Sequence, residues 1–259
     1  MSLRVITATR GESAHLAATV ASAAAVPGAR HILVCPLAAR DGLAGKFPAC
    51  TVLAEAGDGL YAALNTGLAA PGDEELVTWI NDDDVLVSAG FAVALGLFAT
   101  DPALGAVYGR VTMIDATGRR LGALPVAHRP ADLLPLIAAG LMPLAQPGTV
   151  FRRRAVAGVG AFDGLFRLAG DLEYFVRALR AGVRFAFADA EVAQFRLHGG
   201  QLSKDEAAAA AEHARIVAAL PRQPAGAAHW RFRWANLPVY LERVRRHGFV
   251  NMKSLYRHG

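Results

Sequence analysis

An apolar run that ends in three consecutive carboxylates places the strongest constraint on how this chain can fold. Residues 76–80 are predicted to form a buried strand, and Asn81, Asp82, Asp83 and Asp84 follow it directly. Adjacent aspartates repel one another unless a cation lies between them, and hard oxygen ligands suit Mg²⁺ or Mn²⁺. The carboxyl end of a strand in an α/β sheet is also where a nucleotide diphosphate binds. A solvated acidic turn is the alternative for this segment taken alone.

Strand-like and helix-like segments alternate along most of the chain. Strands are predicted at residues 3–9, 31–35, 51–53, 76–80, 105–108, 111–114 and 183–187, and helices at residues 13–25, 59–70, 88–100, 171–180 and 203–220. This alternation predicts an α/β fold with a mostly parallel central sheet flanked by helices. The uncharged stretch 133–151 contains three prolines. We therefore expect a buried loop and helix there rather than a membrane span.

Charge is distributed unevenly along the sequence. Residues 221–259 contain eight Lys and Arg residues against one acidic residue, a charge of +7, so residues 1–220 carry −2 of the overall +5. A near-neutral body with a basic end is not typical of a nucleic-acid-binding domain, and no nucleic-acid partner is expected.

Cys35 and Cys50 fit no metal or redox spacing and predict reduced thiols. Because charged residues from Arg10 onward interrupt any secretory signal, we expect a cytoplasmic protein.

Four motifs occur in a characteristic order. They are VITAT at residues 5–9, EAGDGLYAALNTG at 55–67, INDDD at 80–84, and QPGTVFR, GAFD and GDLE within 146–173. Together they resemble the inverting glycosyltransferases of family 2, whose patterns are E-x-x-D-x-G-I-Y-D-A-M-N-K-G, L-N-S-D-D, H-Q-T-V-F, G-G-F-D-E and A-D-Y-E. The resemblance covers residues 3–205. It implies a glycosyltransferase domain with the GT-A fold over residues 1–220, followed by a basic, aromatic and helical extension over residues 221–259.

In that family these motifs hold a nucleotide-sugar and a divalent cation, which implies roles for the matching residues here. Donor-nucleotide contacts are expected from Thr7, Thr9, Asp58, Asn65, Asp82 and Asp83. Asp84 is the first choice of ligand for Mn²⁺ or Mg²⁺. His198, in a late motif similar to R-x-G-G-x-S, is the second. The alternatives are an ordinary strand threonine at Thr7, a turn residue at Asp58 and a surface histidine at His198.

Three further residues are expected to assist. Leu60, Leu64 and Leu68 share one face of the predicted helix 59–70, which leaves Tyr61 and Asn65 on the opposite face, toward the donor or toward solvent. Glu173 lies two residues from Asp171, the candidate general base discussed below, and would assist it. Arg196, in the late loop, would contact the diphosphate when that loop closes.

The resemblance assigns the general base to Asp171. Inversion requires one carboxylate that accepts the proton of the acceptor hydroxyl as this hydroxyl attacks the anomeric carbon. At a helix start, the amide dipoles would keep this carboxylate ionised. The alternative is a helix N-cap, a position that aspartate often occupies. The chain departs from the family pattern at residues 147–148, where Pro-Gly follows Gln146, and this leaves the acceptor contact open. It departs again at residues 35–38, which lack the acidic residues that many relatives have there, and this leaves the base specificity open.

The C-terminal extension combines aromatic and basic residues. Trp230, Phe232 and Trp234 precede apolar residues at helical spacing, with arginines between them. Such a segment suits a peripheral contact with anionic lipid at the inner face of the cell membrane, where a lipid-linked acceptor would lie. The alternative is that the aromatic side chains pack on the body and the arginines face water.

The sequence therefore predicts a metal-dependent inverting glycosyltransferase. It would move a sugar from a nucleotide-sugar, expected to be UDP-linked, to a hydroxyl of a glycan or lipid-linked acceptor. A sugar nucleotidyltransferase of similar fold is disfavoured, since residues 9–12 read TRGE and lack a glycine-rich G-x-G-x-R loop. A catalytically inactive module that binds nucleotide-sugar is the alternative from another class, and donor hydrolysis separates the two.

Overall fold

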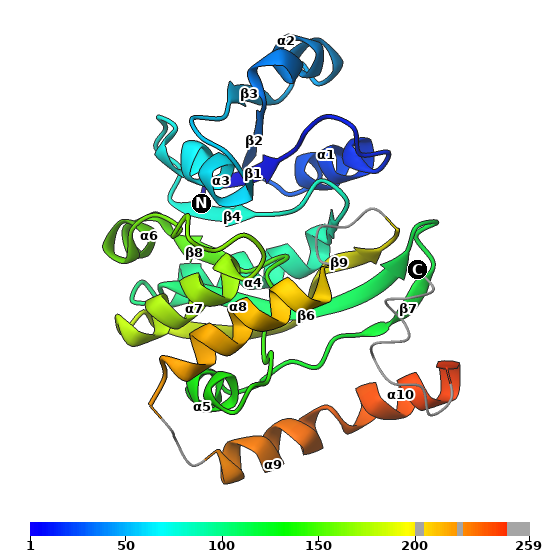
Figure 1. The fold of residues 1–259 in the computed structure, drawn as a ribbon, viewed down its shortest axis with the longest axis vertical. Coiled ribbons are helices and arrows are strands. Elements are labelled where there is room, and N and C mark those ends of the chain that lie inside the picture. The colour runs from blue at the N-terminus through cyan, green and yellow to red at the C-terminus, as the bar shows by residue number, and fades with distance from the viewer. Residues whose placement is uncertain (200–204, 222–224, 248–259) are drawn as a thin grey trace.

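A computed structural model describes residues 1–199, 205–221 and 225–247, and these residues form one nine-stranded sheet with helices on both faces (Figure 1). The strands are β1 (Leu3–Ala8), β2 (Ala29–Cys35), β3 (Thr51–Ala54), β4 (Leu76–Trp79), β5 (Val85–Leu86), β6 (Ala106–Asp115), β7 (Arg120–Ala123), β8 (Val150–Arg152) and β9 (Phe185–Leu197). The helices are α1 (Leu16–Ala24), α2 (Leu37–Lys46), α3 (Leu60–Ala69), α4 (Ser88–Thr100), α5 (Leu133–Ala138), α6 (Arg153–Val159), α7 (Gly170–Arg180), α8 (Glu206–Ala218), α9 (Gly226–Ala235) and α10 (Leu237–His247), with a 3₁₀ turn at Pro130–Asp132.

The strand order is β3-β2-β1-β4-β8-β6-β9-β5, with β7 paired to β6. The first four strands are mutually parallel, as the alternating sequence pattern predicted. The second half is mixed, because β8 runs antiparallel to both β4 and β6 while β6 and β9 are parallel. The chain winds outward from β1 to β3 and then returns to place β4 on the other side of β1. The strand order thus reverses between β1 and β4, and ligands bind beyond the carboxyl ends of strands at such a point.

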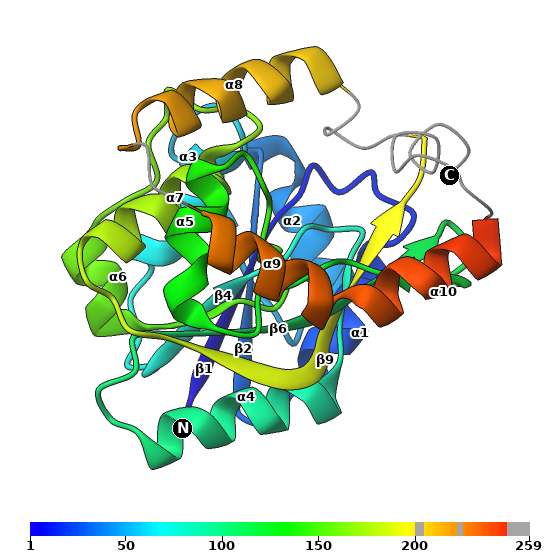
Figure 2. The ribbon, with the colours of Figure 1, turned by 90° about the horizontal axis from the view of Figure 1, so that it is seen from below.

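Alternating side chains of β1 divide the core into two layers. Leu3 and Val5 pack on the side of α4, whereas Ile6 packs on the side of α3 and α7. Figure 2 shows α4 and α8 on opposite sides of the sheet. An aromatic cluster fills the second layer: the Trp79 ring at the end of β4 stacks on Phe151 with centroids 5.4 Å apart and meets Phe162 edge-on at 5.0 Å. This cluster holds the end of β4 against α7, whose Tyr174 and Phe175 rings also contact Trp79.

Two of the predicted strand boundaries are wrong. Residues 105–108 and 111–114 belong to one strand, β6, which pairs with β9 along its whole length through register shifts at Gly109–Val111. The strand predicted at 183–187 instead continues to Leu197, so the segment expected to be a loop from Arg196 begins inside β9. The bulges explain both errors, since they interrupt the alternating pattern of the sequence without ending the pairing. The rest of that motif, residues 200–203, lies outside the described residues, as does the start of the predicted helix 203–220.

The C-terminal extension forms α9 and α10, which follow one another along one side of the body (Figures 1 and 2). Phe232 and Val239 are buried against the body, while Trp230 and Trp234 are exposed. The extension therefore combines features of both alternatives: part of its apolar surface packs on the body and part is exposed.

Cys35 and Cys50 are free thiols. Within the described residues, no helix has both the length and the apolar character that crossing a bilayer demands.

Candidate active site

The loop after β1 and the acidic segment after β4 lie against each other where the strand order reverses. The Thr9 hydroxyl donates a hydrogen bond to Asp82 Oδ2 at 2.5 Å, and the Ser13 hydroxyl donates to the Asp82 carbonyl oxygen at 3.0 Å. Thr19 of α1 donates to the carbonyl oxygen of Asp84 at 2.7 Å. Burial raises the pKa of the Asp82 carboxyl. The structure thus brings Thr9 and Asp82 together, with Ser13 and Thr19 as supports that no sequence motif identifies.

Asp83 is the carboxylate of this segment that is best placed to receive a cation. Its Oδ2 lies 2.9 Å from Nε2 of His198, which follows β9. Its Oδ1 is buried and has no hydrogen-bond partner within residues 1–199, 205–221 and 225–247. A buried carboxylate oxygen without a partner is unfavourable, so this atom is suited to a positively charged ligand. The structure therefore brings Asp83, which was assigned to the nucleotide, together with His198, which was assigned to the metal.

Asp84, the first choice of metal ligand from the sequence, does not fit that role. Its side chain is fully buried, and its two oxygens accept hydrogen bonds from the Arg196 backbone N–H at 2.8 Å and from Asn81 Nδ2 at 3.3 Å. Burial, with the neighbouring Asp83, raises its pKa well above the ordinary value. The motif cannot show this difference, because consecutive residues at a strand end point in different directions. Asp84 instead joins β9 to the acidic segment.

Arg196 is also a structural residue rather than a free contact for a diphosphate. It is 5% exposed. Its Nε donates to the carbonyl oxygen of Asp83 at 2.8 Å, and its Nη1 donates to the carbonyl oxygen of Asp115 at 3.1 Å. The guanidinium thus holds the acidic segment and the β6–β7 turn in place.

Nearby, the His15 ring lies 5.2 Å from the His198 ring, and burial together with the Arg196 charge lowers the pKa of His15. His15 is a site residue that the sequence motifs miss.

Thr7 and Asn65, which were predicted to bind the nucleotide, form hydrogen bonds within the protein instead. Thr7 is fully buried, and its hydroxyl lies 2.9 Å from Nε2 of the buried His31. Asn65 exchanges two hydrogen bonds with the backbone of Phe162, at 3.0 and 2.8 Å. Both side chains thus form their hydrogen bonds within the protein. Asp58, by contrast, is exposed in the turn between β3 and α3, at the carboxyl edge of the parallel strands.

Tyr61 is buried rather than on an outer face of α3. It is 4% exposed, and its ring stacks on Phe162 with centroids 5.4 Å apart. Its hydroxyl accepts a hydrogen bond from the backbone N–H of Asp171 at 3.2 Å. A Cβ atom added to Gly170 would lie 2.6 Å from the Tyr61 ring, so only glycine permits this approach. The first turn of α7 is therefore fixed against the start of α3, the helix that follows the Asp58 turn.

Asp171 is half-buried in this first turn of α7, where it is one residue inside the helix rather than its N-cap. Its Oδ1 accepts a hydrogen bond from the Leu172 N–H at 2.8 Å. Burial nevertheless raises the pKa of the Asp171 carboxyl to about 6, and the hydrogen bonds from Leu172 and Tyr61 only partly offset it. Burial therefore opposes the ionised form that the helix start was expected to favour. A pKa near neutrality suits a general base.

Glu212 of α8 holds the segment that leads into α7. Its two carboxylate oxygens accept hydrogen bonds from the backbone N–H groups of Arg167, Leu168 and Ala169, at 2.8–2.9 Å. These amides precede α7 directly. The negative charge of Glu212 also contributes to the raised pKa of Asp171. Glu212 lies on a separate element, 41 residues from Asp171 in the sequence, and no motif points to it.

Glu173 does not assist Asp171. Both of its oxygens accept hydrogen bonds from Arg177, one turn further along α7, at 2.9 and 2.8 Å. Residues two apart on a helix face different directions. The pair lines an open groove of about 690 Å³ between α7 and α8, away from the Tyr61 contact. Glu173 thus belongs to a surface ion pair.

Comparison with known proteins identifies the fold. No protein-family model matches the chain, and no curated protein is significantly similar in sequence. Among solved structures, the chain is similar to S. aureus TarS (15% identity, TM-score 0.60), to TarS 1-349 (16%, 0.61) and to TarS 1-349 in complex with UDP-GlcNAc (15%, 0.63). Each match covers 98% of this chain, and covers 45%, 77% and 78% of the respective neighbour, so the chain spans less than half the length of the first TarS structure.

At these identities the likeness establishes the fold. The chain has the expected α/β architecture of the GT-A, nucleotide-diphospho-sugar transferase type, with a curled central sheet flanked by helices and a helical C-terminal extension. Asp82, Asp83 and His198 lie around the strand-order reversal of this fold, and Asp171 lies in the first turn of the helix that packs on Trp79. These positions define the candidate active site.

Proposed function

We propose that the chain is an inverting glycosyltransferase that takes a sugar from a UDP-linked donor and transfers it to a hydroxyl of a glycan or lipid-linked acceptor. The nucleotide would lie beyond the carboxyl ends of β1 and β4, with Asp58 at its outer edge and Asp82 at its centre. UDP-GlcNAc is the first donor to test, because it is bound in one of the structural neighbours. A lipid-linked acceptor would place the enzyme at the cytoplasmic face of a membrane.

A divalent cation fits beside Asp83. Within the described residues, no three His, Cys, Asp or Glu side chains converge as a complete metal site. Mg²⁺ is commonly held by one or two carboxylates, with substrate phosphates and water supplying the other ligands. Asp83 Oδ1, which has no hydrogen-bond partner among the described residues, and His198 are the protein groups that would hold Mn²⁺ or Mg²⁺ together with the diphosphate. When bound, the cation would stabilise the negative charge on the leaving nucleoside diphosphate.

Asp171 would act on the acceptor. Its carboxylate would accept the proton of the acceptor hydroxyl while the hydroxyl oxygen forms the new bond to the anomeric carbon and the bond to the diphosphate breaks. Tyr61 positions this carboxylate through the backbone of α7 and through the hydrogen bond that lowers its pKa. One base without a protein nucleophile is the arrangement that gives inversion of the anomeric carbon.

The observation that carries the proposal is the environment of Asp171. Asp171 lies inside α7 and is not its N-cap, Glu212 binds the backbone N–H groups that lead into the helix, and burial raises the pKa of Asp171 to about 6. Perturbed carboxyl groups of this kind concentrate at functional sites. Combined with the GT-A fold, this supports a catalytic carboxylate rather than a structural one.

Calorimetric titration of UDP-GlcNAc and other UDP-sugars in the presence of Mn²⁺, combined with an assay of UDP release, tests the proposal. We expect donor binding that requires the cation, and slow release of UDP without added acceptor. Asp83→Asn should weaken donor affinity tenfold or more, whereas Asp41→Asn, which changes an exposed carboxylate on α2, should not. Binding without any release of UDP would favour the inactive module, and equal affinity in Asp83→Asn would refute the site.

A further inference from the structure

Four large apolar side chains form an exposed stripe along α9 and α10. Trp230 is 63% exposed, Trp234 58%, Leu237 41% and Leu241 50%. Their spacing of four, three and four residues places them within about 60° of one another on a helix that turns about 100° per residue. Asn236, which joins the two helices, has φ −101° and ψ 9°, and the Tyr240 N–H donates to its carbonyl oxygen at 3.1 Å. The stripe therefore continues across the junction.

The opposite face of the two helices is fastened to the body. Its buried residues are Ala228, Phe232, Asn236 and Val239. The Asn236 side chain accepts a hydrogen bond from the Val126 N–H and donates one to the Val126 carbonyl oxygen, both at 2.9 Å. Arg231 pairs with Asp132. These contacts fix the rotation of α9 and α10, so the stripe points away from the protein.

Within the described part of α9 and α10, basic residues flank the stripe and acidic residues do not. Arg233 and Arg245 are exposed and lie about 60° to either side of its midline. Neither forms an ion pair within the part of the chain that the structure describes. Glu242, the single acidic residue of α9 and α10, lies further around the helix and is paired with Arg120 at 3.1 Å and Arg246 at 3.0 Å. The exposed face is thus apolar at its centre and positively charged at its edges.

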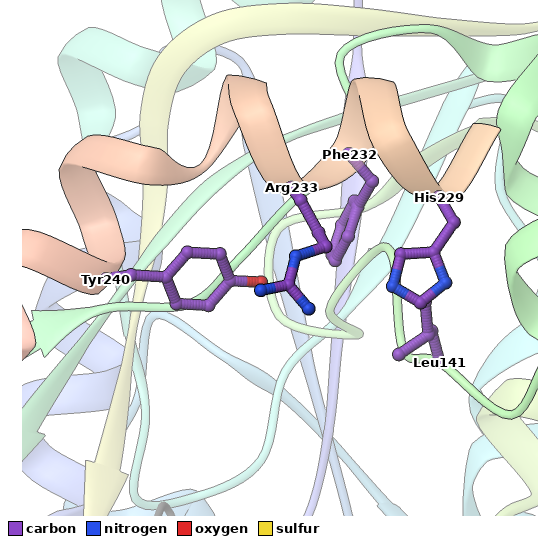
Figure 3. A pocket seen from close by; sticks show the side chains of 5 residues that line it. All are labelled: Leu141, His229, Phe232, Arg233 and Tyr240. Carbon is purple, nitrogen blue, oxygen red and sulfur yellow. The ribbon is translucent and has the colours of Figure 1, made fainter. Parts of the chain in front are cut away.

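A small pocket opens beside the stripe. It has a volume of about 220 Å³ and is lined by Leu141, His229, Phe232, Arg233 and Tyr240 (Figure 3). The Arg233 guanidinium, the His229 ring and the Tyr240 hydroxyl supply hydrogen-bond donors at its wall, and Phe232 and Leu141 supply an apolar side. This combination suits an anionic phosphate that carries an apolar chain.

We propose that the exposed face of α9 and α10 binds the surface of an anionic phospholipid bilayer, with both helices parallel to the membrane plane. The two tryptophans and two leucines would enter the boundary between headgroups and acyl chains, while Arg233 and Arg245 contact lipid phosphates. One headgroup phosphate would occupy the pocket at Arg233. Charge complementarity favours lipid over a second copy of this chain, because stripe-to-stripe pairing would oppose arginines to arginines without an acid between them.

Vesicle flotation of the full chain, with a variant that removes both tryptophans, tests this inference. We expect the wild-type protein to float with vesicles of phosphatidylcholine and phosphatidylglycerol, but not with phosphatidylcholine alone, and to bind less at high salt. Trp230→Ala/Trp234→Ala should lose at least tenfold in binding with an unchanged melting temperature. Leu165→Ala, which shortens a 78% exposed leucine elsewhere on the surface, is the matched control and should bind as the wild type does.

Tryptophan emission provides a second readout. Trp79, the third tryptophan of the chain, is 2% exposed and should not respond. A blue shift on addition of the anionic vesicles would therefore report Trp230 and Trp234 entering the bilayer. Absence of binding at low salt overturns the proposal, as does equal binding by the double variant. A wild-type dimer in light scattering that the double variant converts to a monomer would instead identify the stripe as a protein interface.

Discussion

Replacing Asp171 with asparagine should make the protein more stable and nearly inactive. The folded chain holds this carboxyl at a pKa of about 6 against an ordinary value of 3.8. At 1.36 kcal/mol per pKa unit, ionising it in the folded state costs on the order of 3 kcal/mol. Because the side chain retains some contact with solvent, we expect a smaller effect of about 1–2 kcal/mol. Asparagine keeps the acceptor for the Leu172 N–H but carries no charge, so it removes this cost.

The sign of the pH dependence follows from the direction of the shift. A carboxyl whose pKa is raised on folding favours the folded state below its ordinary pKa, and this contribution is lost as the pH rises through about 6. Asp171→Asn should therefore raise the melting temperature at pH 8 by roughly 2–8 °C, at about 2–4 °C per kcal/mol for a chain of this size. At pH 4 the two proteins should melt together.

Differential scanning calorimetry at both pH values, paired with an assay of UDP release, measures the two effects. Turnover of the variant should fall by roughly a hundredfold or more, the usual scale for loss of a general base, with donor affinity nearly intact. Asp73→Asn changes an exposed carboxylate and should alter neither quantity. A variant that is no more stable at pH 8, or that turns over as fast as the wild type, would refute the reasoning.

Three other predictions follow from the contacts around the site. Tyr61→Phe removes a hydrogen bond that lowers the pKa of Asp171, so the acidic limb of the pH profile of kcat/KM should move to higher pH. Tyr174→Phe is the control and should not move this limb, because the buried Tyr174 hydroxyl has no partner among the described residues. Glu212→Gln should lower the free energy of unfolding by about 1–2 kcal/mol, because it weakens three charged hydrogen bonds. It should also shift the acidic limb to lower pH, because the negative charge of Glu212 raises the pKa of Asp171. Glu75→Gln, which changes an exposed carboxylate, should alter neither quantity. Asp84→Asn keeps its buried shape and the acceptor for Arg196, so calorimetry should show metal-dependent donor affinity within about threefold of wild type; a loss as large as that of Asp83→Asn would restore Asp84 as the ligand.

The parallel half of the sheet and the acidic segment were predictable from the sequence because local patterns specify them. A short apolar run followed by charged residues marks the end of a buried strand, and the order of the motifs places that end next to β1. The face of α3 was harder to predict. Leucine spacing identifies the side that packs on the sheet, but α3 is also covered by Phe162 and α7, which buries Tyr61 as well.

The division of labour among neighbouring carboxylates could not be read from the sequence. Asp83 and Asp84 are adjacent and chemically identical, and only the pairing of β9 with the acidic segment determines which is enclosed. Glu212 was missed for a related reason: it reaches α7 from a helix that follows β9, and such a contact leaves no local pattern. The motif singles out Asp171 as a candidate, but the raised pKa of its carboxyl depends on burial, which only the fold shows.

The most direct test of the central claim is a crystal structure of the full chain with UDP-GlcNAc and Mn²⁺. We expect the diphosphate and the cation beside Asp83 and His198, beyond the ends of β1 and β4, with the anomeric carbon of the sugar facing the first turn of α7 and Asp171. A nucleotide bound in the groove between α7 and α8, or a cation held by Asp84 instead of Asp83, would contradict it.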